Sequence, residues 1–150
     1  MKRSIWMVPI LVCFFLGPSP IDAGDFDGTT PLLCATIRVL ECLEDGSCNQ
    51  VAPEAVDMPQ FFMIDFNKKE IRTPKPDMTD RISQIERMEH VDGKLIIQGA
   101  EDGDANIPDG LGWSLAISEE TGKWVLSASG DRVAFVVYGA STPGTLSVRE

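Results

Sequence analysis

Histidine is nearly absent from the chain of 150 residues, which contains only His90. A Ser-His-Asp hydrolytic site would have to use this one residue, and the sequence has no Gly-x-Ser-x-Gly motif to accompany it. His90 lies between Glu89 and Val91, just before a predicted hairpin turn, so we interpret it as an exposed hairpin residue. A zinc site would need His90 together with cysteines, but Cys42 and Cys48 lack the usual Cys-x2–4-Cys spacing.

Positive charge is also scarce, since 13 Lys and Arg stand against 23 Asp and Glu and give a formal net charge of −10. The chain therefore has no basic patch of the kind that binds nucleic acid, and it has no glycine-rich phosphate-binding motif. An acidic surface disfavours anionic partners such as phosphates and membrane surfaces, and it permits cationic ones. We interpret most of the charge excess as a solvated surface and expect no nucleic-acid partner.

Long apolar runs are confined to the beginning of the chain. Lys2 and Arg3 are followed by the apolar stretch 5–16, two prolines and then Asp22-Ala23-Gly24. This order of charged, apolar and small residues is typical of a secretory signal peptide, whereas a spanning helix needs roughly 20 apolar residues. We expect a signal peptide over 1–23, a single β domain over 24–150, a periplasmic or secreted location and no integral membrane span.

Four cysteines are present, of which Cys13 lies in the predicted signal peptide. The other three, Cys34, Cys42 and Cys48, allow one disulfide bond and one free thiol in an oxidising compartment, or an intermolecular bond. Cys42 and Cys48 flank the turn-forming stretch Glu-Asp-Gly-Ser at 44–47, so two strands leaving that turn would bring their sulfur atoms together. We predict a Cys42–Cys48 disulfide and a buried Cys34 that behaves as a small hydrophobic residue.

Short apolar segments alternate with turn residues along the rest of the chain, without a βαβ pattern. The segment 33–43 favours a strand, because it is rich in Ile, Val, Leu and Thr. Period-two counting places Leu33, Ala35, Ile37 and Val39 on one face of it. The segment 51–60 is predicted to be a loop that holds one short turn of helix. Further strands are predicted at 61–66, 70–73, 95–98, 113–118, 124–129 and 133–138.

The segment 79–90 is ambiguous, because its apolar residues recur at helical spacing although a hairpin signal follows at 91–94. We favour a strand here and keep a short helix as the alternative. About eight strands then predict an all-β fold. We expect an antiparallel meander that is closed or partly closed into a barrel, because closure removes exposed sheet edges. A β-sandwich is the alternative architecture.

Trp113 and Trp124 begin the two most regular strands, on opposite sides of the turn at 119–123. Alternation places each indole on the more apolar face of its strand. The turn centre implies that the two side chains are offset along the hairpin and do not face one another. We expect both to be sheltered from solvent if this face forms the interior of the barrel.

Acidic residues are so frequent that pairs of them say nothing about catalysis, although a glycosidase needs two carboxylates about 5 Å or 6.5–9.5 Å apart. Asp65 is the most interesting one, because it lies in the apolar stretch 61–66 on the face shared by Phe61 and Met63. Burial there would raise its pKa and suit it to acid–base work. We favour a carboxylate that faces solvent or caps the turn at Asn67-Lys68, and we assign no catalytic residue.

The strongest polar motif is an acidic loop with oxygen ligands at alternate positions. Asp102, Asp104 and Asn106 match the first, third and fifth positions of an EF-hand loop, and Asp109 adds another carboxylate. Ile107 stands where that loop needs glycine, and flanking helices are missing from the predicted elements. A weak, irregular calcium site is therefore a hypothesis, with a solvated acidic loop as the default. We expect no other cofactor.

Three stretches, 31–35 (PLLCA), 112–117 (GWSLAI) and 135–140 (FVVYGA), are similar to segments of a group of small exported bacterial proteins with no assigned activity. This resemblance covers most of the chain after the leader. It implies a bacterial, secreted protein with a β-rich fold, and it implies nothing about activity or site residues.

The aromatic residues after the leader either fill the core or line a cavity, since eight-stranded barrels are near the size at which one small ligand fits. The leading hypothesis is a non-enzymatic exported β-barrel that binds a small apolar ligand or a protein partner. One alternative is an envelope inhibitor or interaction protein whose acidic loops meet a basic protein partner. Another is a small carboxylate-dependent hydrolase. Architecture alone is weak support for any of these functions.

Overall fold

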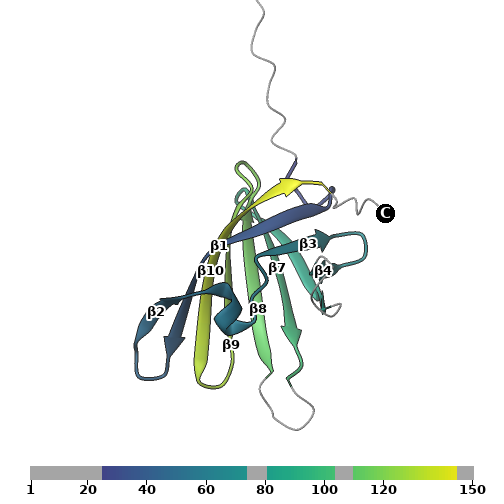
Figure 1. Cartoon of the computed structure of the whole chain (residues 1–150). Coiled ribbons are helices and arrows are strands. Elements are labelled where there is room, and N and C mark those ends of the chain that lie inside the picture. Colours follow the sequence, from purple (N-terminus) through teal and green to yellow (C-terminus); the bar gives the residue numbers. More distant parts are fainter. Residues whose placement is uncertain (1–24, 74–80, 104–109, 145–150) are drawn as a thin grey trace, which may run out of the picture.

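The computed structural model describes residues 25–73, 81–103 and 110–144 of the chain (Figure 1). Almost all of the described elements are strands, which confirms the predicted all-β fold. The elements in chain order are β1 (Leu32–Leu43), β2 (Cys48–Val51), the 3-10 turn η1 (Pro53–Val56), β3 (Phe61–Asp65), β4 (Glu70–Arg72), β5 (Ile82–Gln84), β6 (Arg87–Val91), β7 (Lys94–Glu101), β8 (Leu111–Ser118), β9 (Lys123–Ser129) and β10 (Val133–Pro143).

The strands form one antiparallel sheet in the order β5-β4-β3-β1-β10-β9-β8-β7-β6, and β2 pairs with β1 outside this path. Most neighbours in the sheet are also neighbours in sequence. The pairing of β1 with β10 is different, because it places the first described strand beside the last one. The sheet curls around a common interior (Figure 1). The meander in a partly closed barrel is therefore confirmed, and one curled sheet replaces the sandwich alternative.

The two ends of this sheet meet at the bend between β5 and β6. The N–H of Ile85 donates to the carbonyl of Lys69, next to β4, at 2.8 Å. The N–H of Glu86, the following residue, donates to the carbonyl of Gln98 in β7 at 2.9 Å. The segment therefore passes from one side of the opening to the other as extended chain, which confirms strand over helix for its described part.

Trp113 and Trp124 both lie over glycines of neighbouring strands. Trp113 pairs with Gly99 of β7, and Trp124 pairs with Gly139 of β10. A Cβ atom at Gly99 would lie 2.4 Å from Cζ2 of Trp113, and one at Gly139 would lie 2.0 Å from Cζ2 of Trp124, so only glycine leaves room for the indoles. The indoles are 7% and 2% exposed. They are offset as predicted, because Trp113 is opposite Ala128.

The core lies on the concave side of the curled sheet. Trp124 contacts Phe62 edge-on, with ring centroids 5.3 Å apart, a favourable geometry for two aromatic rings. Cys34 is a buried free cysteine, as predicted, and burial raises the pKa of its thiol far above the ordinary value. The buried apolar residues are Leu32, Cys34, Val39, Phe62, Ile64, Phe66, Ile85, Leu95, Ile97, Trp113, Leu115, Ile117, Trp124, Ala128 and Val137.

The prediction that Leu33, Ala35, Ile37 and Val39 share one face of the first strand is wrong. In the structure Ile37 is 68% exposed, and Cys34 and Val39 are both buried although they differ in parity. The register between β1 and β10 shifts between residues 36 and 38. A bulge of this kind adds one residue to the strand and exchanges the faces of all residues beyond it.

The turn η1 is the only helical element in the described ranges, and it matches the short helical turn predicted between residues 51 and 60. Asp57 follows it in the left-handed region at φ 53°, which aspartate tolerates better than most residues. Within the ranges that the structure describes, we find no helix with the length and apolar character required to cross a membrane.

Candidate ligand cavity

A cavity of about 130 Å³ lies inside the curled sheet. It occupies the half of the barrel that carries the β9–β10 turn and the C-terminal half of β1. Its walls come from β1, β3, β4, β5 and from β7 to β10, together with η1 and the residues after it. Apolar side chains dominate the lining, among them Val39, Phe62, Trp113, Leu126, Phe135 and Val137. An apolar cavity of roughly 150 Å³ is large enough to bind benzene.

The two buried indoles both keep an unpaired N–H group in the part of the chain that the structure describes. The indole of Trp113 lines the cavity, and its Nε1 is buried without a hydrogen-bond partner among the described residues. Trp124, which does not line the cavity, has an unpaired Nε1 as well. Buried tryptophan N–H groups usually have a partner. Each indole therefore has a buried donor without a partner among the described residues.

A charged rim borders the cavity where Arg81 precedes β5. Arg81 donates from Nη2 to Oε2 of Glu101 at 2.9 Å, and its Nη1 pairs with Oδ2 of Asp57. Ser83 donates its hydroxyl to Oε1 of Glu101. The side chain of Asp57 is 75% exposed and that of Glu101 is 27% exposed. Two carboxylates thus share one guanidinium, which gives the described residues of the rim an excess of negative charge.

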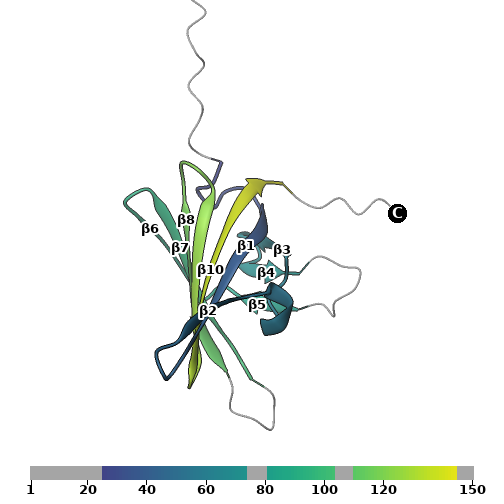
Figure 2. The same cartoon turned by 60° about the vertical axis from the view of Figure 1, so that its left-hand side comes forward.

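Three separate elements position these rim residues. Asp57 directly follows η1, Arg81 directly precedes β5, and Glu101 is the last residue of β7. Figure 2 shows the short helical turn η1 beside β5, where Asp57 and Arg81 meet. No local sequence motif links these residues, because the contact between β5 and β7 brings Arg81 to Glu101 and a third segment supplies Asp57.

The calcium hypothesis falls largely outside the described residues. Asp104, Asn106 and Asp109 lie outside them, and Asp102 is described as an exposed residue after β7. In the described part of the chain, no three or more His, Cys, Asp or Glu side chains are grouped in a way that could hold a metal ion. The calcium loop therefore stays a prediction.

Asp65 caps the turn after β3, as predicted. Its Oδ1 accepts a hydrogen bond from the backbone N–H of Lys68 at 3.0 Å, and its Oδ2 lies 3.4 Å from Nζ of the same lysine. The backbone hydrogen bond is the main cause that lowers the pKa of Asp65 below its ordinary value. This is the opposite of the raised pKa that acid–base work would need.

His90 is an exposed residue of β6, which confirms the interpretation made from its position. Its Nδ1 lies 2.5 Å from Oε1 of Glu119 at the β8–β9 turn. The two residues are on the outer surface, and neither lines the cavity. The structure therefore does not bring His90 to the site.

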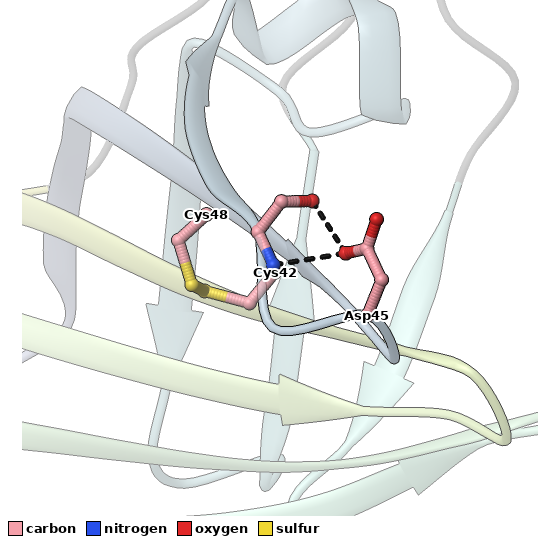
Figure 3. The surroundings of a disulfide bond; sticks show 4 residues. Cys42, Asp45 and Cys48 are labelled. Carbon is pink, nitrogen blue, oxygen red and sulfur yellow. Dashed lines mark hydrogen bonds between the residues drawn. A yellow bond between two sulfur atoms is a disulfide. The ribbon is translucent and has the colours of Figure 1, made fainter.

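The predicted disulfide is present. Cys42 and Cys48 pair across β1 and β2, and their sulfur atoms are 2.03 Å apart (Figure 3). Asp45 closes the turn between them, because its Oδ1 accepts hydrogen bonds from the backbone N–H of Ser47 at 2.9 Å and from the Ser47 hydroxyl at 2.6 Å. These hydrogen bonds lower the pKa of Asp45. The bond holds a peripheral hairpin and does not border the cavity.

An apolar cavity with a few charged groups at its edge has the general chemistry of a small-molecule binding site. Comparisons of the chain with protein-family models, with curated proteins and with solved structures find no match. Function must therefore be argued from the geometry of this site.

Proposed function

We propose that the protein is a non-enzymatic, exported β-barrel that binds a small apolar ligand in this cavity. The observation that carries the proposal is an apolar cavity of about 130 Å³ within the barrel. A space of that size suits an aromatic ring or a branched alkyl group of about six carbons. Export rests on the predicted signal peptide, and a disulfide bond agrees with an oxidising compartment.

Filling the cavity tests the proposal directly. Ala128 is buried, lines the cavity and is opposite Trp113. Ala128→Leu would put apolar atoms where a ligand would lie. We expect the wild-type protein to bind benzene or toluene by calorimetry and the folded variant to lose this binding. Leu126→Phe serves as a second filling variant if Ala128→Leu does not fold.

Ala116→Leu is the matched control, because Ala116 lies on β8 but does not line the cavity. It adds the same atoms outside the proposed site, so it should keep the affinity of the wild type. Wild-type affinity in both folded filling variants would contradict the proposal. Failure of the wild-type protein to bind any small apolar probe would contradict it as well.

A protein partner is the second candidate, favoured by apolar side chains on the outer face. Val125 of β9 and Tyr138 of β10 are exposed and paired with each other, and Ile37 is exposed at the bulge of β1. Tyrosine is enriched at protein interfaces. Native mass spectrometry of the protein purified from its own envelope would separate the candidates, since it shows either a retained small molecule or a retained protein.

A further inference from the structure

We propose that the ligand of the cavity is a small organic amine, with its apolar group inside the cavity and its ammonium group at the charged rim. This inference rests on the proposed function and specifies the chemical class of the ligand. Its basis is the combination of an apolar interior with a rim in which carboxylates outnumber cations. Asp57, Arg81 and Glu101 line the same cavity as Trp113, so one small molecule can contact both parts.

Asp57 is the rim group that remains available to a cation. Both oxygens of Glu101 are engaged, Oε1 by Ser83 and Oε2 by Arg81. The carboxylate of Asp57 pairs with Arg81 through Oδ2 only, and no described residue donates to its Oδ1. Its side chain is also the most exposed of the three charged ones. An ammonium group at the mouth can therefore reach Oδ1 without displacing an existing partner.

An anionic ligand would meet the opposite situation. Among the described residues that line the cavity, Arg81 is the only cation, and both of its partners are carboxylates. A ligand carboxylate that binds the remaining N–H groups of Arg81 would lie close to both of these carboxylates, and their negative charge would repel it. The formal net charge of −10 adds long-range repulsion of anions and attraction of cations.

Aromatic rings in the wall favour a cation independently of the carboxylates. Phe62, Trp113 and Phe135 all line the cavity. The face of an aromatic ring attracts an ammonium group electrostatically, and tryptophan does so most strongly. A cation that enters part of the way from the rim therefore remains stabilised, whereas an anion is not.

Three probes of similar shape and different charge test the inference: 2-phenylethylamine, 2-phenylethanol and 3-phenylpropanoate. We expect the amine to bind about tenfold more tightly than the propanoate at low ionic strength, with the alcohol between them. This preference should shrink as salt screens the exposed rim, while the affinity of the alcohol stays unchanged.

Asp57→Asn should lower the affinity for the amine to that for the alcohol and leave the alcohol unaffected. Asparagine tolerates the left-handed backbone at this position, so the variant should fold. Asp92→Asn is the matched control, because it removes the same charge at an exposed turn that also has positive φ but does not line the cavity. It should keep the preference for the amine.

The outcomes separate this inference from the proposed function. Binding of the alcohol without a preference for the amine, or an unchanged preference in Asp57→Asn, would overturn the amine proposal alone. Tighter binding of the propanoate would also overturn it and would indicate that Arg81 exchanges its partners. Failure of all three probes to bind would overturn the proposed function itself.

Discussion

Removal of the Trp124 indole should cost much of the stability of the domain. The side chain is 2% exposed, covers Gly139 and contacts Phe62 edge-on. An aromatic side chain buries 150–250 Å², which at about 25 cal/mol per Å² gives an upper estimate of roughly 4–6 kcal/mol. Large-to-small changes in cores give about 3–5 kcal/mol for this residue type, so we expect that loss for Trp124→Ala.

This expected loss is measurable because it is a large part of the usual total of about 5–15 kcal/mol. The assay is urea unfolding followed by far-ultraviolet circular dichroism, since the variant keeps Trp113 but loses Trp124, and its fluorescence is therefore not directly comparable with that of the wild type. Val125→Ala is the control: its exposed side chain lies on the opposite face of β9 and should cost less than about 1 kcal/mol. A loss below about 1 kcal/mol for Trp124→Ala, with an unchanged slope, would refute the assigned core.

Three further predictions follow from other parts of the chain. Replacing Cys42 and Cys48 together by serine should weaken folding by roughly 2–3 kcal/mol in urea unfolding without abolishing it, because the closed loop is short; peptide mapping that finds Cys34 in the bond would contradict the pairing. Hydrogen bonds lower the pKa of Asp65 in the folded state below its ordinary value of 3.8. The ionised carboxylate therefore stabilises the folded protein above pH 3.8, and this stabilisation is lost as the pH falls through the lowered folded-state pKa. Asp65→Asn should therefore reduce acid sensitivity in thermal unfolding between these pKa values, and an unchanged pH profile would refute this. N-terminal sequencing of the native protein should begin near Gly24, whereas an intact Met1 in a cytoplasmic fraction would exclude cleavage.

The strands with strict alternation were predictable from the sequence. Trp113, Leu115 and Ile117 recur at every second position, and all three are buried in β8. The inner face of β1 was not predictable in the same way, because the bulge between residues 36 and 38 reverses the alternation and is visible only in the register with β10. Period-two counting assumes an uninterrupted ladder, so a single inserted residue defeats it.

The rim of the cavity could not be predicted from local sequence. Asp57, Arg81 and Glu101 come from segments far apart in the chain, and nothing in their immediate neighbours marks them as a group. The acidic stretch after Glu101 led to the calcium prediction instead, because a sequence shows the spacing of residues along the chain and not their positions in space. Long-range strand pairing decides which charges meet, and this depends on the whole fold.

Core filling and cavity lining were alternatives for the aromatic residues in the sequence, but the barrel uses both. Trp124, Leu95 and Ile97 are buried and do not line the cavity, so they fill one part of the interior. Phe62 is shared, because it packs against Trp124 and also lines the cavity. Trp113 packs against Gly99, where a Cβ would collide with its indole. Because Gly99 has no side chain, the indole of Trp113 can pack against it and form part of the cavity wall without filling the cavity. Because the same Cβ would also lie 2.4 Å from the backbone carbonyl oxygen of Gln84, Gly99→Ala should displace both β5 and the indole and weaken the binding of an apolar probe in molecules that remain folded.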